Sequence, residues 1–323
     1  MTSGFLSQAA LNRSAHKKTY CFMAGLPRAG STMLSSILNQ NPRIYSGPSS
    51  PVLSSMFVVE NHFANDELYN GYPKPDQVKL ILSNIINHFY DDVKKPVVCD
   101  KNRAWVGRVE YIQGYIGQDA KIIVPVRDIA EILTSMIMMI RRNPYKEGNP
   151  RVNFIDEQLI KSNIPLTDDN RCEYIGGPGG ILGQSMDAIR QGLNAGWGRH
   201  FHFVEYRDLV SNPQEEMNKI YKFIGEEPFT HNFNTLKNQN RETDMATYGI
   251  SDMHEVRPVV KSTSKDPKDV LSERILSMCQ GMEFWRPENF TQGVQQLPVN
   301  VVGPSPKISI PDPHKAAGFT IKQ

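Results

Sequence analysis

The most chemically informative segment of the chain is the octapeptide GLPRAGST at positions 25–32. It follows an apolar run, residues 20–24, and precedes an amphipathic stretch, so the pattern predicts a strand, a tight loop and a helix. Backbone N–H groups of such a loop and of the first helical turn converge on one point, where the helix dipole also favours negative charge. Arg28 adds a planar set of donors, and Ser31 and Thr32 add hydroxyls. The segment is predicted to bind a phosphate or a similar oxyanion, the alternative being a strand-to-helix turn that binds nothing.

The same residues argue against the phosphate chemistry of a Walker A loop. A Walker A loop reads GxxxxGK[ST], in which the Lys contacts the terminal phosphates and the hydroxyl binds magnesium. Ser31 stands where that Lys would be, which disfavours an ordinary ATP or GTP hydrolase. Two alternatives stay open: a P-loop kinase for a small molecule, which would need Asp100 or Asp128 to hold magnesium, and a nucleotide-binding protein without turnover.

A second set of polar residues follows a later apolar run. KIIVPV at residues 121–126 has the composition of a buried parallel strand, and a helical pattern of apolar residues begins directly after it. Arg127 therefore lies at the carboxyl end of a strand, the edge at which open α/β sheets bind ligands. Ser135 follows about two helical turns later, on the same face. The pattern predicts that Arg127 and Ser135 share a binding site, the alternative being that Arg127 is a solvated residue at a helix start.

The two motifs together, PRAGST in the first loop and VPVRDIAEILTSM around Arg127, resemble those of the sulfotransferase family, which uses 3′-phosphoadenosine 5′-phosphosulfate (PAPS) as its donor. The similarity continues in CDKNRAW at 99–105 and in the stretches 204–225 and 253–267, and it covers most of residues 18–287. It is closest to the bacterial and tyrosylprotein-type branches. The resemblance implies an α/β fold with a mainly parallel sheet flanked by helices, like that of P-loop NTPases. It also implies transfer of a sulfuryl group to a hydroxyl or amine of a carbohydrate, lipid, peptide or metabolite.

The resemblance further implies which residues bind the donor. In the family the first loop binds the 5′-phosphosulfate, an Arg and a Ser bind the 3′-phosphate, a Tyr lies beside the adenine, and a late loop folds over the 3′-phosphate. The donor-binding residues implied in this way are Arg28, Ala29, Gly30, Ser31, Thr32, Met33, Arg127, Ser135, Tyr206, Lys261 and Ser262. The product would be adenosine 3′,5′-bisphosphate (PAP), and no metal is expected, because positive side chains replace magnesium.

Two of the cations are expected to act on the transferring group. Sulfuryl transfer builds negative charge on the bridging oxygen of the departing phosphate, so fixed cations at that oxygen should carry much of the catalysis. Arg28 is the first such cation. Lys101 is the second, since it matches a family lysine that reaches the sulfuryl group. Arg28 and Lys101 are therefore the predicted catalytic residues.

The group that would take the acceptor's proton does not carry over from the family. The cytosolic branch has a His two residues after the matching lysine, where this chain has Arg103. The tyrosylprotein-type branch has a Glu soon after the first loop, where Ser49 stands here. The residues that remain open on chemical grounds are Glu60, His62, Asp100 and His254.

The composition is compatible with such an enzyme. At 323 residues, with 39% hydrophobic content, the chain can bury one large core. A net charge of only +2 argues against a general nucleic-acid binder. The four cysteines show no CxxC spacing and are expected to be buried free thiols in a reducing compartment. Without a long apolar run or a signal peptide, the protein is expected to be cytoplasmic and not inserted in a membrane.

Apolar periodicity predicts the elements that position these residues. Strands are expected over 96–99 and 202–205 as well as at the two motifs, and helices over 76–93, 105–116, 179–197 and 213–224.

The domain organisation follows from where that periodicity stops. Residues 143–178 lack this apolar periodicity and are predicted to be an insertion. The insertion is either a lid over the acceptor or a surface segment without a role in binding. One α/β domain is expected over 1–290, followed by an extended proline-rich tail over 291–323.

Overall fold

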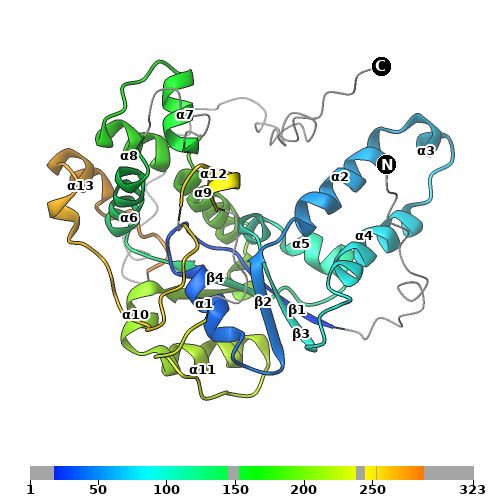
Figure 1. Cartoon of the computed structure of the whole chain (residues 1–323). Coiled ribbons are helices and arrows are strands. Elements are labelled where there is room, and N and C mark those ends of the chain that lie inside the picture. Colours follow the sequence, from blue (N-terminus) through cyan, green and yellow to red (C-terminus); the bar gives the residue numbers. More distant parts are fainter. Residues whose placement is uncertain (1–17, 145–152, 238–243, 252, 287–323) are drawn as a thin grey trace, which may run out of the picture. The chain divides into compact units, whose positions relative to one another are not determined.

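A five-stranded parallel sheet forms the centre of the protein (Figure 1). The computed structural model describes residues 18–144, 153–237, 244–251 and 253–286. In spatial order β2-β3-β1-β4-β5, the strands are β1 (Thr19–Met23), β2 (Ile44–Ser49), β3 (Val97–Lys101), β4 (Ile122–Val126) and β5 (Phe201–Glu205). The predicted α/β fold with a mainly parallel sheet is confirmed.

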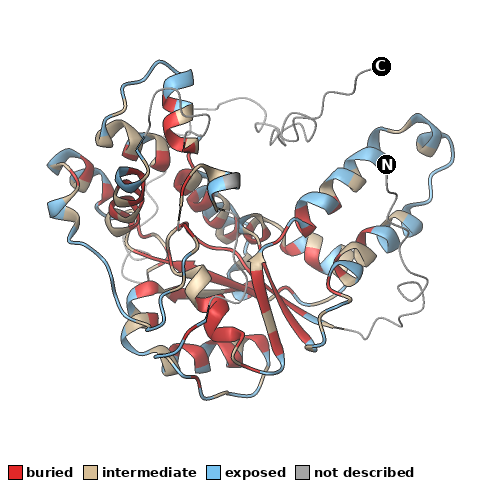
Figure 2. Cartoon of the chain, in the orientation of Figure 1, coloured by how far each residue is buried: buried red, intermediate tan, exposed pale blue. Residues whose placement is uncertain are grey.

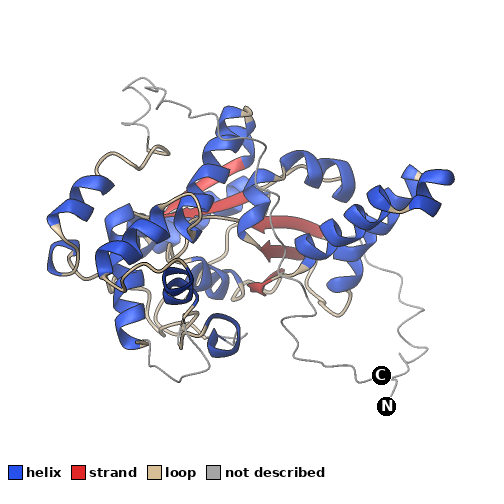
Figure 3. Cartoon of the chain, turned by 90° about the horizontal axis from the view of Figure 1, so that it is seen from above, coloured by secondary structure: helices blue, strands red, loops and turns tan. Residues whose placement is uncertain are grey.

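Helices lie on both sides of the strands (Figure 3). Those of eight residues or more are α1 (Ser31–Leu38), α2 (Val52–Asn65), α4 (Pro75–Phe89), α6 (Ile129–Arg142), α7 (Phe154–Lys161), α8 (Asp168–Gly176), α9 (Ile181–Asn194) and α11 (Pro213–Ile224). The shorter ones are α3 (Glu67–Gly71), α5 (Val109–Tyr111), α10 (Tyr206–Ser211), α12 (Asp244–Tyr248) and α13 (Glu273–Cys279).

The inner strands β1, β3 and β4 are buried on both faces, which explains the apolar sequences of β1 and β4 (Figure 2). Successive residues of β1 point to opposite sides. Cys21 and Met23 join the core cluster formed with α1 and α11, whereas Phe22 packs its ring against Trp105, with 4.4 Å between the ring centroids. The sheet is therefore covered on both faces, and the place left for polar chemistry is its edge.

The strand register brings the carboxyl ends together. Met23, the last residue of β1, pairs with both Lys101 of β3 and Ile123 of β4, and Val126 pairs with Glu205 of β5. The residues that follow these strands therefore meet at one edge, which is where parallel sheets bind ligands.

Several elements differ from the sequence-based expectation. Residues 105–116 form a 3₁₀ turn, the short helix α5 and a π turn rather than one helix. β2 and α2 were not predicted. The described part of the predicted insertion contains α7 and α8, whose few apolar residues escaped the periodicity. These two helices are joined instead by an ion pair of 2.7 Å between Arg171 Nε and the fully buried carboxylate of Asp156.

The described residues up to Met282 form one compact unit, and residues 283–286 belong to a second. The predicted tail, 291–323, lies outside the described residues, as does 145–152 within the predicted insertion. All four cysteines are buried free thiols, as expected. Within the described ranges, no helix is both long and apolar enough to cross a membrane.

Candidate active site

The loop between β1 and α1 has the geometry of an anion-binding turn. Gly30 adopts a left-handed conformation, with φ of 87°, and has no side chain to cap the first-turn N–H groups of α1. Arg28 also has a positive φ, 59°, which is uncommon and strained for a residue other than glycine. The chain thus holds the Arg28 side chain in place at some cost in backbone strain.

Two glycines in this loop are required by close contacts. A Cβ atom at Gly25 would lie only 2.1 Å from the carbonyl oxygen of Pro125, so the loop after β1 approaches β4 there more closely than any side chain allows. A Cβ atom at Gly30 would lie 3.0 Å from the ring of Tyr206. The loop is therefore packed against the ends of β4 and β5.

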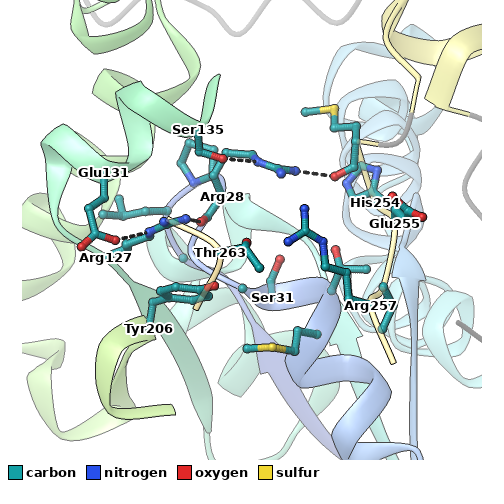
Figure 4. A pocket seen from close by; sticks show the side chains of 18 of the residues that line it. Arg28, Ser31, Arg127, Glu131, Ser135, Tyr206, His254, Glu255, Arg257 and Thr263 are labelled. Carbon is teal, nitrogen blue, oxygen red and sulfur yellow. Dashed lines mark hydrogen bonds and ion pairs between the residues drawn. The ribbon is translucent and has the colours of Figure 1, made fainter. Parts of the chain in front are cut away.

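A cavity of about 750 Å³ opens at this edge of the sheet, within the size range of small-molecule sites (Figure 4). Its walls come from the loop after β1, the ends of β2 and β3, one face of α6, the start of α10, the end of α12 and the late segment 253–265. Residues from seven places along the chain thus line one space.

Arg28 crosses the cavity. Its Nε donates to Ser135 Oγ at 3.2 Å, and its Nη1 donates to the backbone oxygen of Met253. Figure 4 shows the side chain between Ser135 and the segment that carries His254. Burial, with the nearby charges of Arg127 and Arg142, lowers the pKa of Arg28 to about 10. The site therefore concentrates positive charge that an anion would neutralise.

Arg127 is held from several sides. Its Nε donates to Glu131 Oε2 at 2.9 Å, its Nη1 to the backbone oxygen of Arg28 at 3.0 Å, and its Nη2 to Ser264 Oγ at 2.6 Å. Its guanidinium also lies over the ring of Tyr206, 4.2 Å from the centroid. Arg127 is buried, so these contacts fix its orientation beside the first loop.

The cavity gathers most of the predicted site residues. Those that line it are Arg28, Gly30, Ser31, Thr32, Met33, Lys101, Arg127, Ser135, Tyr206 and Lys261. Ala29 is buried and outside this lining. Ser262 is also outside the lining, and it donates to Ser264 Oγ at 3.2 Å, so Ser264 is the hydroxyl beside Arg127.

Three residues that the sequence analysis did not single out belong to the site. Glu131 accepts from both Arg127 and Ser264, and the i, i+4 spacing of Arg127 and Glu131 on a helix is a signal that could have indicated the pair. Thr134 lines the cavity, and its buried Oγ1 has no hydrogen-bond partner among the described residues. Arg257 reaches the cavity from the late segment.

Of the four residues left open as a base, the structure brings only His254 into the cavity wall. Glu60 accepts a hydrogen bond of 2.6 Å from Tyr115 Oη, and the side chain of His62 is largely exposed. Asp100 is fully buried and accepts from Tyr90 Oη and Trp105 Nε1, each at 2.7 Å, and burial raises its pKa.

The carboxylates that a kinase would need for magnesium are likewise outside the cavity lining. Asp100 is enclosed in the core, and Asp128 caps α6 by accepting from the backbone nitrogen of Glu131 at 3.1 Å. Within the part of the chain that the structure describes, no group of three or more His, Cys, Asp and Glu side chains is placed to hold a metal ion.

The sulfotransferase domain family model matches residues 18–281, which includes every wall of this cavity. The chain belongs to the sulfotransferase family. It is a sulfotransferase, an enzyme that moves a sulfuryl group from a donor to an acceptor. A comparison with curated proteins found no match.

Solved structures of low sequence identity resemble this sulfotransferase. The sulfotransferase domain of the Synechococcus PCC 7002 olefin synthase is 14% identical, over 82% of this chain and 94% of that one, with a TM-score of 0.47. A sulfotransferase from Alicyclobacillus acidocaldarius is 16% identical, over 72% and 89%, with a TM-score of 0.41. Retinol dehydratase in complex with androsterone and inactive cofactor PAP is 12% identical, over 86% and 82%, with a TM-score of 0.44.

Proposed function

We propose that the donor of this sulfotransferase is PAPS and that the cavity binds it through two guanidinium groups. The observation that carries the proposal is the coupling of Arg28 and Arg127. Arg127 donates to the backbone of Arg28, and Arg28 donates to Ser135, so the two cations form one unit around the first loop. A ligand with phosphate groups at two separate positions fits this arrangement better than a nucleotide with a single phosphate chain.

Both guanidinium groups keep donors for a ligand. A guanidinium has five N–H groups. Among the described residues, Arg127 uses three of them in hydrogen bonds, which leaves two, and Arg28 uses two, which leaves three. The lowered pKa of Arg28 and the unpartnered Oγ1 of Thr134 are further reasons to expect an anion with several acceptor oxygens here.

In the proposed complex, Arg28, Lys101 and the N–H groups of the first loop, residues 28–33, bind the 5′-phosphosulfate. Lys101 is a buried residue at the carboxyl end of β3 in the same cavity, where it would stabilise the charge that develops on the departing oxygen. PAPS supplies the sulfuryl group, and PAP is the product.

The other end of the donor is assigned to the opposite wall. Arg127 and Ser135 bind the 3′-phosphate, with Lys261 and the hydroxyls around Ser262 and Ser264 closing over it. Tyr206, whose ring lies under the Arg127 guanidinium, contacts the nucleoside.

The acceptor is a hydroxyl or amine on a carbohydrate, lipid, peptide or metabolite. The single α/β catalytic domain is assigned to residues 1–290, with the insertion 143–178 as a lid over the acceptor.

The proposal is tested by calorimetric titration with PAP, ADP and ATP, each with magnesium and with a chelator. PAP is expected to bind without magnesium and much more tightly than ADP, because only PAP has a 3′-phosphate. Arg127→Ala should weaken PAP binding by about 2 kcal/mol, roughly 30-fold, and leave ADP binding nearly unchanged. Magnesium-dependent preference for ATP over PAP would overturn the proposal.

A further inference from the structure

The cavity wall contains a histidine held by a carboxylate. His254 Nδ1 lies 2.6 Å from Asp244 Oδ1, and the backbone nitrogen of His254 donates to Asp244 Oδ2 at 2.8 Å. Asp244, on α12, thus fixes both the main chain and the ring of His254. Both side chains are mostly buried, with 16% of His254 and 11% of Asp244 exposed.

This contact decides which ring nitrogen can take a proton. An ionised carboxylate only accepts hydrogen bonds, so Nδ1 of His254 carries the hydrogen and Nε2 carries the lone pair. A carboxylate that orients an imidazole in this way also stabilises the imidazolium formed after proton transfer. The pair has the chemistry of a general base and its positioning partner.

The pair is also tied to the proposed reaction centre. Met253 precedes His254, and its backbone oxygen accepts a hydrogen bond from Arg28 Nη1. Figure 4 shows His254 on the wall beyond the tip of Arg28, on the side opposite Arg127. The peptide unit between Met253 and His254 therefore connects the His–Asp pair to Arg28, the cation that is proposed to bind the transferring group.

Other carboxylates and imidazoles in or near the cavity fit this role less well. Glu131 is engaged by Arg127 and Ser264 at the opposite wall. Glu255 lines the cavity, but it follows His254 in the chain and has no contact with Asp244 that would orient it as the ring is oriented. Outside the cavity, His62 lies 3.9 Å from Asp66 at the exposed C-terminal end of α2, and His200 Nδ1 lies 3.4 Å from Asp119 Oδ1.

We infer that His254 is the general base for the acceptor, that Asp244 positions it, and that the acceptor group is a neutral hydroxyl. The inference rests on the proposed function. The acceptor oxygen attacks sulfur, the bond between sulfur and the bridging oxygen of PAPS breaks, and its electron pair stays on the 5′-phosphate of PAP. The acceptor's proton goes to Nε2 of His254. A hydroxyl needs this proton removed as it attacks, whereas a neutral amine can attack first, so a built base favours a hydroxyl.

The experiment uses water as the acceptor hydroxyl and PAPS as the donor. Release of sulfate from ³⁵S-labelled PAPS is measured under single-turnover conditions and at steady state. The wild-type enzyme should hydrolyse PAPS faster than buffer does, and His254→Gln should lower kcat by about 10²-fold or more with an unchanged KM for PAPS. Asp244→Asn, which keeps an acceptor oxygen for the backbone, should lower kcat at least about tenfold. Added imidazole should restore part of the rate of His254→Ala.

Matched controls separate this inference from the proposed function. His62→Gln and Asp66→Asn alter a His–Asp pair outside the cavity and should leave hydrolysis unchanged. PAP binding by each variant is measured in parallel and should match the wild-type enzyme. Failure of the wild-type enzyme to bind PAP would overturn the proposed donor. Normal PAP binding with hydrolysis no faster than in buffer, or with full activity in His254→Gln, would overturn the assignment of the base alone.

Discussion

Positive charge defines the site at the scale of single residues. Arg28 and Arg127 are adjacent cations, and of these two it is Arg127 that donates to the carboxylate of Glu131, whereas Arg28 donates to Ser135 and to the backbone of Met253. The lowered pKa of Arg28 shows that its charged form is disfavoured in the fold, by burial first and by Arg127 and Arg142 second. This energetic cost is present at every pH below about 10, where Arg28 is charged, and an anionic ligand would offset it.

The energetic cost of the Arg28 charge predicts that removing it does not lower the stability of the ligand-free protein but weakens PAP binding. Arg28→Gln removes the charge, so the melting temperature of the ligand-free protein should equal that of the wild type or exceed it by about 2 °C. The same variant should lose most of the increase in melting temperature that PAP produces in the wild-type protein. Thermal shift measurements with and without PAP check both points. A ligand-free variant that melts well below the wild type would show that the Arg28 guanidinium stabilises the fold.

Close packing at the ends of the central strands positions the first loop at the scale of elements. Pro125 lies within β4, an inner strand of the sheet. Proline is normally excluded from such a position because it cannot donate a hydrogen bond to a neighbouring strand. The atoms of Pro125 nearest to Gly25 include its nitrogen and its carbonyl oxygen. Pro125, which has no backbone N–H, thus lies against Gly25, which has no side chain. Next to this contact, the backbone nitrogen of Leu26 donates to the Pro125 oxygen at 2.9 Å.

The Gly25–Pro125 contact predicts a large effect of a single methyl group. Gly25→Ala should lower stability by about 2 kcal/mol and abolish PAP binding, because the loop must move away from β4. Gly107→Ala is the matched control, since a Cβ atom at Gly107 would have no heavy atom within 4 Å, and it should behave like the wild type. Chemical denaturation and calorimetry measure the two effects. Equal results for the two variants would contradict the packing argument.

At the scale of the whole molecule, residues far apart in sequence hold the late cavity wall against the core. The backbone nitrogen of Leu236 donates to the oxygen of Pro258 at 2.7 Å, and that of Val260 donates to the oxygen of Phe233 at 2.8 Å. The segment around Phe233 is anchored by His231, which lies 2.8 Å from Tyr221 Oη on α11 and stacks on its ring. Burial lowers the pKa of His231 from 6.5 to about 4.

The buried His231 predicts loss of stability in acid. His231 is neutral in the folded state and binds a proton near pH 6.5 when unfolded, so stability is fully present above about pH 6.5 and is lost as the pH falls towards 4. The loss from this group should reach about 3 kcal/mol. His202, whose pKa is also lowered by burial, should add to it. Denaturation of the wild type and of His231→Gln at several pH values measures the effect, and the variant should show a flatter dependence. An equally steep variant would assign the acid sensitivity to other groups.

The sequence by itself determined the parts of this protein that depend on local chemistry. The glycine loop after an apolar run predicted β1, the turn and α1, and the strand before Arg127 predicted the second binding element, because backbone conformation and apolar periodicity are local properties. The sulfotransferase family also followed from these motifs, and the family match confirmed it.

Only the tertiary structure decided which side chains share the cavity. Ser264 rather than Ser262 contacts Arg127, and one of four residues open as a base reaches the cavity, because these positions depend on how the late segment packs against the distant elements β1 and α6. The helices α7 and α8 were not predicted, because each buries only two apolar side chains and a buried ion pair adds to the contact between them. The pairing of His254 with Asp244 joins the late segment to α12, and no local sequence pattern encodes the relative placement of these two parts.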